Sequence, residues 1–199
     1  MKYKSKKGFT LAELLIVVAI IAVRVAISIP IFTGQLEKAR RAVDMQNARA
    51  IESALVLAYN TGEIEVPKKS GGQHGYGVWV MLCNKTAEYA PKPYHDKSVK
   101  GMWCGANQGV TVGNNTATDD WTYNKSVENI LKEAGMDVVA LRTRSNGGAD
   151  GWDWMIIEVG YDTSGQFFTR IYSGYKNENG SAGTTGYSNI EKQIYGKSS

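Results

Sequence analysis

Hydrophobic and polar positions form two successive patterns along the first sixty residues. From Phe9 to Phe32 nearly every position is apolar, and as a helix this stretch would be about 36 Å long, enough to cross a hydrocarbon core of about 30 Å. From Gln35 onward, apolar residues recur at steps of three and four, which predicts an amphipathic helix. We therefore expect one helix from Phe9 to about Asn60, whose second half packs one stripe of side chains on a partner.

The predicted stripe on its second half consists of Leu36, Ala39, Val43, Gln46 or Asn47, Ala50 or Ile51, Ala54, Leu55 and Ala58.

Pro30 and Gly62 are expected to affect the course and the end of this helix. Pro30 lacks a backbone donor and crowds the carbonyl of Ala26, so we expect a helix kink or a local opening there. Gly62 can take the left-handed conformation that ends a helix.

The remaining chain, from Glu63 to Ser199, is rich in glycine and aromatic residues. Its periodicity predicts a helix over Tyr123–Ala134 and a short terminal helix from Ser188. Alternating apolar residues on both sides of a turn signal predict a hairpin of two strands. The predicted hairpin strands are Trp152–Tyr161 and Gln166–Tyr175.

Three further stretches have weaker patterns. Val138–Arg144 is compatible with a strand, Val78–Leu82 with a helix or a strand, and Pro91–Gly105 has no regular pattern. A long helix packed on a small antiparallel sheet is an α+β arrangement. We divide the chain into a leader (1–8), a transmembrane or filament-core helix (9–32), an amphipathic second half of the helix (33–61) and a globular α+β head domain (62–199).

The net positive charge of the chain comes from its leader. The full chain has 23 Lys and Arg against 19 Asp and Glu, a formal net charge of +4. Four lysines lie before Gly8, so without them the two signs balance at 19 each. This asymmetry is typical of a segment that stays on the cytoplasmic side of a membrane. It gives no support for a specific nucleic-acid partner, and a neutral remainder favours self-association.

The start of the apolar segment has an unusual order of residues. Glu13 places a carboxylate among apolar side chains, where an unpaired charge is costly, so a partner is expected. The small residue Gly8 comes before the apolar run, whereas a secretory signal has its cleavage site after it. Cleavage between Gly8 and Phe9 would remove the leader and leave the apolar segment on the mature chain.

These residues resemble the amino terminus of type IV pilins, which are made with a class III leader peptide. The resemblance is carried by Lys6-Lys7-Gly8-Phe9-Thr10-Leu11, by Glu13 two residues later, and by about twenty apolar positions after it. It covers roughly the first third of the chain and implies the pilin fold. The chain resembles major pilins, but the sequence does not distinguish a major from a minor subunit. Gln35–Arg40 is similar to pilins of clostridial type. The pseudopilins of type II secretion and DNA uptake share the same motif.

The resemblance also implies a life cycle. A prepilin peptidase would cut between Gly8 and Phe9 and methylate the new amino terminus of Phe9. The precursor would wait in the cytoplasmic membrane as a single-pass protein, and the inner-membrane pilus assembly machinery would then extract it into a helical homo-oligomer on the cell surface. Glu13 would neutralise the amino terminus of a neighbouring copy during assembly. Such filaments serve adhesion, aggregation and biofilm formation, or twitching motility.

The chain has few residues for other chemistry. Its only histidines are His74 and His95, their spacing with the cysteines matches no zinc pattern, and we expect no metal, no cofactor and no enzymatic activity. Cys83 and Cys104 enclose a loop of about twenty residues and could form a disulfide outside the cell. Two free buried thiols are the alternative.

Arg24 interrupts the apolar segment and has three explanations. The side chain can snorkel to the outer headgroups, it can pair with a carboxylate of a neighbouring copy, or it can be an engineered or erroneous residue in place of an aliphatic one. The last is slightly favoured, because nothing nearby in the sequence compensates the charge. A pair with Glu13 of the same helix is excluded, since eleven residues separate them by about 16 Å.

Three functions remain open from the sequence. The first is a structural subunit of a type IV pilus, and the second is a pseudopilin of a secretion or DNA-uptake machine. The third is a secreted binding protein or enzyme with an ordinary signal peptide cut after Ala26-Ile27-Ser28. Against the third, Glu13 and Arg24 would interrupt the apolar core of such a signal.

Overall fold

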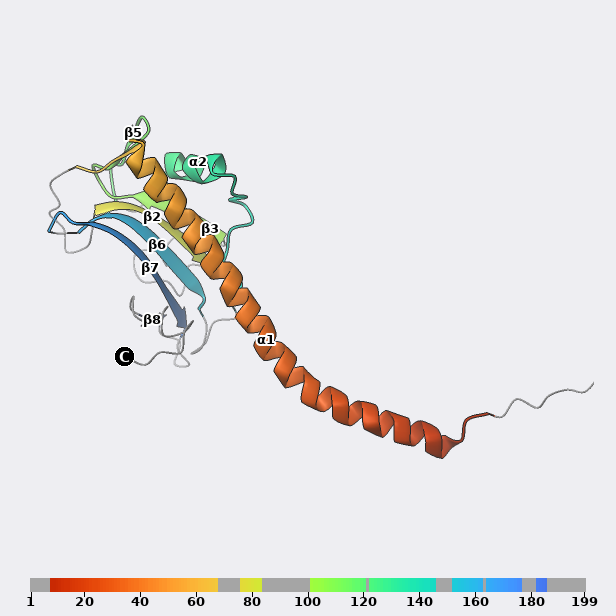
Figure 1. Cartoon of the computed structure of the whole chain (residues 1–199). Coiled ribbons are helices and arrows are strands. Elements are labelled where there is room, and N and C mark those ends of the chain that lie inside the picture. The colour runs from red at the N-terminus through yellow and green to blue at the C-terminus, as the bar shows by residue number, and fades with distance from the viewer. Residues whose placement is uncertain are drawn as a thin grey trace, which may run out of the picture. The chain divides into compact units, whose positions relative to one another are not determined.

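The computed structural model describes residues 8–67, 76–83, 101–120, 122–145, 152–162, 164–176 and 182–185 (Figure 1). The elements are α1 (Leu11–Asn60), β1 (Ile64–Glu65), β2 (Tyr76–Cys83), β3 (Gly101–Ala106), β4 (Thr111–Val112), β5 (Asn115–Thr116), α2 (Lys125–Glu133), β6 (Trp154–Tyr161), β7 (Phe167–Lys176) and β8 (Ala182–Thr185). The chain forms two compact units, Met1–Ala39 and Arg40–Ser199, and α1 contributes to both. One long helix and antiparallel sheets make this an α+β fold, as predicted.

The second unit is built on a five-stranded antiparallel sheet in the order β3-β2-β6-β7-β8. The predicted hairpin is confirmed as β6 and β7, in which Tyr161 pairs with Phe167 next to the turn. Val78–Leu82 is a strand, since it lies within β2, an interior strand of the sheet between β3 and β6. A second, three-stranded sheet has the order β1-β4-β5.

The period of two along the central strands places their side chains in two separate clusters. Val78, Val80 and Leu82 of β2 belong to the main core, which also contains buried residues of α1 and α2. Trp79, Met81 and Cys83 belong to a second cluster with Trp154 and Ile156 of β6. Because alternate residues of a strand point to opposite faces, α1 covers one face of this sheet (Figure 1) and the tryptophan-rich cluster occupies the other.

The buried stripe of α1 follows helical spacing but differs in part from the prediction. Its members are Asp44, Ala48, Ile51, Ala54, Leu55 and Ala58. The apolar positions from Ile51 onward are confirmed, whereas Val43 and Ala50 are exposed and Asp44 is buried. The sequence pattern missed Asp44 because a carboxylate is rarely fully buried without partners.

Two segments after β2 differ from their predictions for identifiable reasons. Gly101–Ala106 is strand β3, although two glycines obscure its alternation. The pattern of Val138–Arg144 is compatible with a strand, but the structure has a turn followed by irregular chain there, so this interpretation is wrong. The Asp137 carboxylate accepts hydrogen bonds from the N–H groups of Val139 and Ala140, which stabilises the turn. The predicted terminal helix at Ser188 lies outside the described residues.

Helix α2 is confirmed, with its beginning fixed by a cap. Asn124 has an extended backbone, and its side-chain oxygen accepts hydrogen bonds from the N–H groups of Ser126 and Val127. These bonds satisfy donors that the first turn of a helix leaves free. Val127, Ile130 and Leu131 then pack in the main core, which fixes the apolar face of α2.

Gly105 occupies a position in β3 where a larger residue does not fit. A Cβ atom there would lie 2.3 Å from Cζ2 of Trp79, the residue with which Gly105 pairs. The indole cannot easily move away, because it is 3% exposed and its Nε1–H donates to the carbonyl of Asp120 at 3.2 Å. The close approach of this ring therefore requires glycine.

We predict that Gly105→Ala lowers the free energy of unfolding by about 1–3 kcal/mol, because overpacking forces the indole or the strand to shift. The matched control is Gly34→Ala in α1, where an added Cβ meets no atom within 4 Å. Alanine favours helix, so the control should be neutral or stabilising by up to about 1 kcal/mol. Denaturant unfolding of the full chain in detergent, followed by tryptophan fluorescence and circular dichroism, measures both. Equal midpoints for the two variants would contradict the packing argument.

Candidate functional site

The first turn of α1 is closed by a reciprocal pair of side chains. Thr10 precedes the helix, and both its N–H and its hydroxyl donate to Oε2 of Glu13 at 2.8 Å. In return, the N–H of Glu13 donates to Oγ1 of Thr10 at 3.3 Å. This is a capping box, which satisfies donors at the helix start and places a negative charge beside them. The Thr-x-x-Glu spacing signals it in the sequence, but the sequence analysis considered Glu13 only as an assembly residue.

The capping box leaves part of the Glu13 carboxylate available. Both bonds from Thr10 end on Oε2, and within the described part of the chain Oε1 has no hydrogen-bond partner. A carboxylate can accept bonds at both oxygens. Glu13 can therefore cap its own helix and bind a second cationic group at the same time.

Gly8 has no structural reason to be glycine. A Cβ atom added there meets nothing within 4 Å, and the residue does not have the positive backbone φ that favours glycine. Phe9, which follows it, is 84% exposed. Among the described residues, no contact therefore requires glycine at this position.

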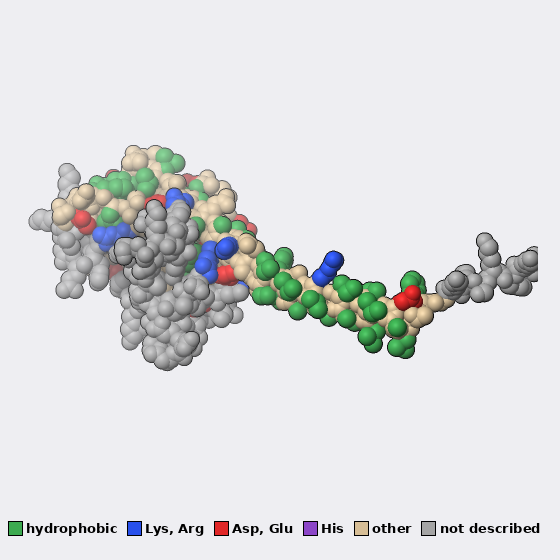
Figure 2. All heavy atoms as spheres, turned by 60° about the horizontal axis from the view of Figure 1, so that its bottom comes forward, with side chains coloured by type: hydrophobic (Ala, Val, Ile, Leu, Met, Phe, Trp, Pro, Cys, Tyr) green, Lys and Arg blue, Asp and Glu red, His purple; other side chains and the backbone are tan. Residues whose placement is uncertain are grey.

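The first half of α1 exposes an apolar surface on all sides. From Phe9 to Phe32 the large hydrophobic side chains are 47–84% exposed, and Figure 2 shows apolar side chains along the visible face of this half of the helix. The helix contains a window of 18 residues with a mean hydropathy of 2.8, none of it buried, so it is long and apolar enough to cross a membrane. Covering each such side chain contributes about 1.5–3 kcal/mol, so a membrane or other copies of the helix would stabilise this segment strongly.

Arg24 lies within this apolar surface without a partner. Its side chain is exposed, and no residue in the described ranges forms a hydrogen bond or an ion pair with its guanidinium. Its carbonyl accepts a bond from the hydroxyl of Ser28 at 2.7 Å, which leaves the guanidinium unaffected. Arg24 and Glu13 are the only charged residues from Phe9 to Leu36.

Pro30 lies inside α1, and the helix continues on both sides of it. Thr33 donates its hydroxyl to the carbonyl of Pro30 at 3.0 Å. The predicted kink at Pro30 stays a prediction.

A buried carboxylate on the second half of α1 binds donors from the chain that follows α2. Asp44 accepts hydrogen bonds from the N–H groups of Arg144 at 2.7 Å and Ser145 at 3.0 Å, and from Nε1 of Trp152 at 2.7 Å. Burial raises the pKa of Asp44, and these bonds counteract part of the rise. The chain after α2 is therefore attached to α1 by a hub that the sequence analysis did not identify.

The two cysteines are free and lie on opposite faces of the sheet. Cys83 pairs with Gly101 and belongs to the tryptophan-rich cluster, whereas Cys104 pairs with Val80 and belongs to the main core. They are three positions apart along the strands, about 10 Å, which exceeds the span of a disulfide. The structure therefore shows the alternative of two buried thiols.

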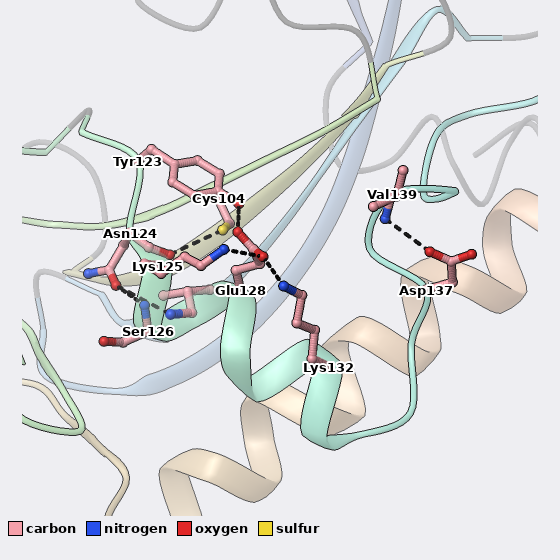
Figure 3. Close-up of polar contacts among 10 residues, drawn as sticks. Cys104, Tyr123, Asn124, Lys125, Ser126, Glu128, Lys132, Asp137 and Val139 are labelled. Carbon is pink, nitrogen blue, oxygen red and sulfur yellow. Dashed lines mark hydrogen bonds and ion pairs between the residues drawn. The ribbon is translucent and has the colours of Figure 1, made fainter.

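Cys104 lies next to a charged cluster on α2, shown in Figure 3. Glu128, whose side chain is 8% exposed, accepts hydrogen bonds from Lys125 at 2.6 Å, from Lys132 at 2.5 Å and from the hydroxyl of Tyr123. The bonds from Lys125, Lys132 and Tyr123 lower the pKa of Glu128 to about 2. Two lysines of its own helix and the hydroxyl of Tyr123, which comes before the helix, thus keep the carboxylate ionised. These bonds stabilise the fold and do not indicate a site of chemistry.

The described residues contain no group of three or more His, Cys, Asp and Glu side chains placed to hold a metal ion. Both histidines lie outside the described residues.

Comparison with known proteins finds similarity at the amino terminus and over about half of the chain. The family described as "Prokaryotic N-terminal methylation motif" matches residues 3–29. The chain is 31% identical over 127 residues to the protein named "Type IV major pilin protein PilA" of Myxococcus xanthus, over 58% of this chain and 56% of that relative. The match thus spans little more than half of the relative's length. No solved structure gives a significant match.

We predict that neither cysteine reacts with iodoacetamide in the native chain. Burial raises the pKa of Cys83 and of Cys104 to about 12, so at pH 8 both thiols are protonated as well as inaccessible. After unfolding without reductant, intact-mass spectrometry should show two alkylations. A chain that takes up the reagent only after reduction would contain the disulfide and contradict this geometry.

We predict that Glu128→Gln lowers stability at pH 7 by about 1 kcal/mol, since the exposed lysines are partly screened by water. The folded pKa of about 2 lies below the ordinary 4.5. The stabilisation is therefore complete above 4.5 and is lost as the pH falls towards 2. The variant should lose less stability than the native chain over that window, as measured by thermal unfolding. Glu133→Gln, on the exposed side of the same helix, is the control and should leave the pH profile unchanged.

Proposed function

We propose that this chain, a type IV pilin by its amino-terminal motif and its similarity to a major pilin, is the structural subunit of a type IV pilus. The observation that carries the proposal is the methylation motif over residues 3–29, which runs into α1, together with the exposure of the apolar side chains on this half of the helix. A surface of this kind needs a hydrophobic environment. A bilayer provides it for the precursor, and the packed helices of other copies provide it in the filament.

Processing at Gly8 and Phe9 is the first step of the proposed function. A prepilin peptidase cuts between them and methylates the amino terminus of Phe9. The absence of any packing constraint on Gly8 supports this, because the small residue then serves the peptidase. The leader lysines remain on the cytoplasmic side, and the mature chain stays in the cytoplasmic membrane by α1.

Assembly of the filament is the second step. The inner-membrane pilus machinery extracts the subunit, and copies pack their apolar helices into a helical homo-oligomer on the cell surface. Glu13 neutralises the amino terminus of Phe9 in a neighbouring copy, and its free Oε1 supports this role. The filament serves adhesion, biofilm formation or twitching motility, and the chain is not an enzyme.

A pseudopilin of a secretion or DNA-uptake machine is the second candidate. It has the same amino-terminal motif, which supports it equally. The similarity to a protein named as a major pilin favours the pilus subunit. The two differ in abundance outside the cell, because a pilus contains very many copies.

The deciding experiment is intact-mass and amino-terminal peptide mass spectrometry of protein sheared from the native cell surface. We expect an abundant chain that starts at Phe9 and has one added methyl group. Gly8→Val should block processing and leave the precursor in the membrane, whereas Gly34→Ala should process normally. An unprocessed Met1, or a start near Ile29, would contradict the pilin proposal. Correct processing without recovery in filaments would favour the pseudopilin.

A further inference from the structure

We infer that Arg24 of one copy forms an ion pair with Glu13 of a second copy when the apolar helices pack together. This inference rests on the proposed assembly into a filament, and it concerns a contact that the assembly would need. It replaces the explanation of Arg24 as an erroneous residue. The pair would also fix how far one copy of the helix is shifted along its axis relative to a neighbouring copy.

The two residues lie on the same face of α1. Eleven residues separate them, which at 3.6 residues per turn is about three turns, with an angular difference of only about 20°. The same spacing places them about 16 Å apart along the axis, too far for an ion pair within one helix. Figure 2 shows red and blue side chains among the green apolar ones along the extended part of the helix.

Both groups are incompletely partnered. The Arg24 guanidinium binds nothing in the described chain, and Oε1 of Glu13 is free while Thr10 occupies Oε2. Packing of the surrounding apolar side chains against other helices would remove water from both charges. An unpaired charge in such an environment is strongly unfavourable, and a paired one much less so. Glu13 is the only acidic side chain from Phe9 to Leu36, so it is the only carboxylate of this segment that Arg24 of a second copy can reach.

The symmetry of a helical assembly allows the pair to repeat. All copies present the same face to the filament axis, so two residues on that face can meet across the axis when the copies are shifted by about 16 Å. The flexible arginine tolerates a shift of a few ångströms either way. Each copy then gives Arg24 to one neighbour and Glu13 to another, an open-ended contact that propagates along the filament. A carboxylate oxygen can accept more than one hydrogen bond, so Oε1 can accept from Arg24 of one copy and from the amino terminus of another.

Charge variants of Arg24 provide the first test, with membrane content measured beside filament yield. Arg24→Glu places two carboxylates on one face and should reduce the filament yield about tenfold or more, whereas Arg24→Lys should stay within about twofold of native. Arg24→Leu removes an insertion penalty of about 2.5–3.5 kcal/mol, so its membrane content should equal or exceed native while its filament yield falls. Native filament yield for both the leucine and the glutamate variants would overturn the inference and indicate a snorkelling side chain.

Cysteine cross-linking provides the second test, on filaments from the full chain. Val17 and Ser28 each follow one of the paired residues by four positions, so Val17→Cys with Ser28→Cys should form disulfides between copies. The control pair, Val18→Cys with Ile29→Cys, has the same separation but lies on another face and should not cross-link. Peptide mass spectrometry identifies the joined residues and separates them from Cys83 and Cys104.

The outcomes of these tests distinguish this inference from the proposed function. Normal filaments that cross-link only through the control pair would overturn the pair between Arg24 and Glu13 and leave the pilus subunit intact. If the native chain forms no filament and carries no methyl group on Phe9, the proposed function fails as well.

Discussion

Helix α1 carries a long apolar surface that the described residues leave exposed. Its second half packs Ala48, Ile51 and Leu55 into the main core of the head, where each is fully buried. Between Phe9 and Phe32 the large apolar side chains stay exposed, and no described part of the chain covers them. Because the hydrophobic effect penalises such a surface in water, every proposed step, from membrane anchoring to filament assembly, follows from this one helix.

The head is built so that the second half of α1 is part of its core. Alternating residues of β2 and β6 divide between the face under α1 and the tryptophan-rich cluster on the other face. The Asp44 carboxylate adds a polar connection, since three N–H donors from Arg144, Ser145 and Trp152 converge on it. A buried carboxylate with three donors tolerates little displacement, so it fixes the chain after α2 against the helix.

The sequence predicted the elements whose patterns are local. The long helix, α2 and the hairpin of β6 and β7 all follow from periodicity and turn residues, and the structure confirms them. The pattern failed where a contact distant in sequence decides the conformation. Residues 138–144 have the composition of a strand, yet Arg144 donates its N–H to Asp44, a hundred residues earlier. Strand β3 was missed because Gly105 accommodates the Trp79 ring across the ladder.

The candidate site divides in the same way. The sequence by itself determines the resemblance to pilins. That resemblance depends on the order of Gly8, Phe9 and Glu13 and on the apolar run after them, because a signal for processing and membrane insertion consists of consecutive residues. The spacing of Glu13 and Arg24 on one helical face is also a property of the sequence. Only the tertiary structure decided that Cys83 and Cys104 are free, since strand register places them on opposite faces of the sheet. It also decided that Asp44 is buried, because the donors that permit this come from another part of the fold.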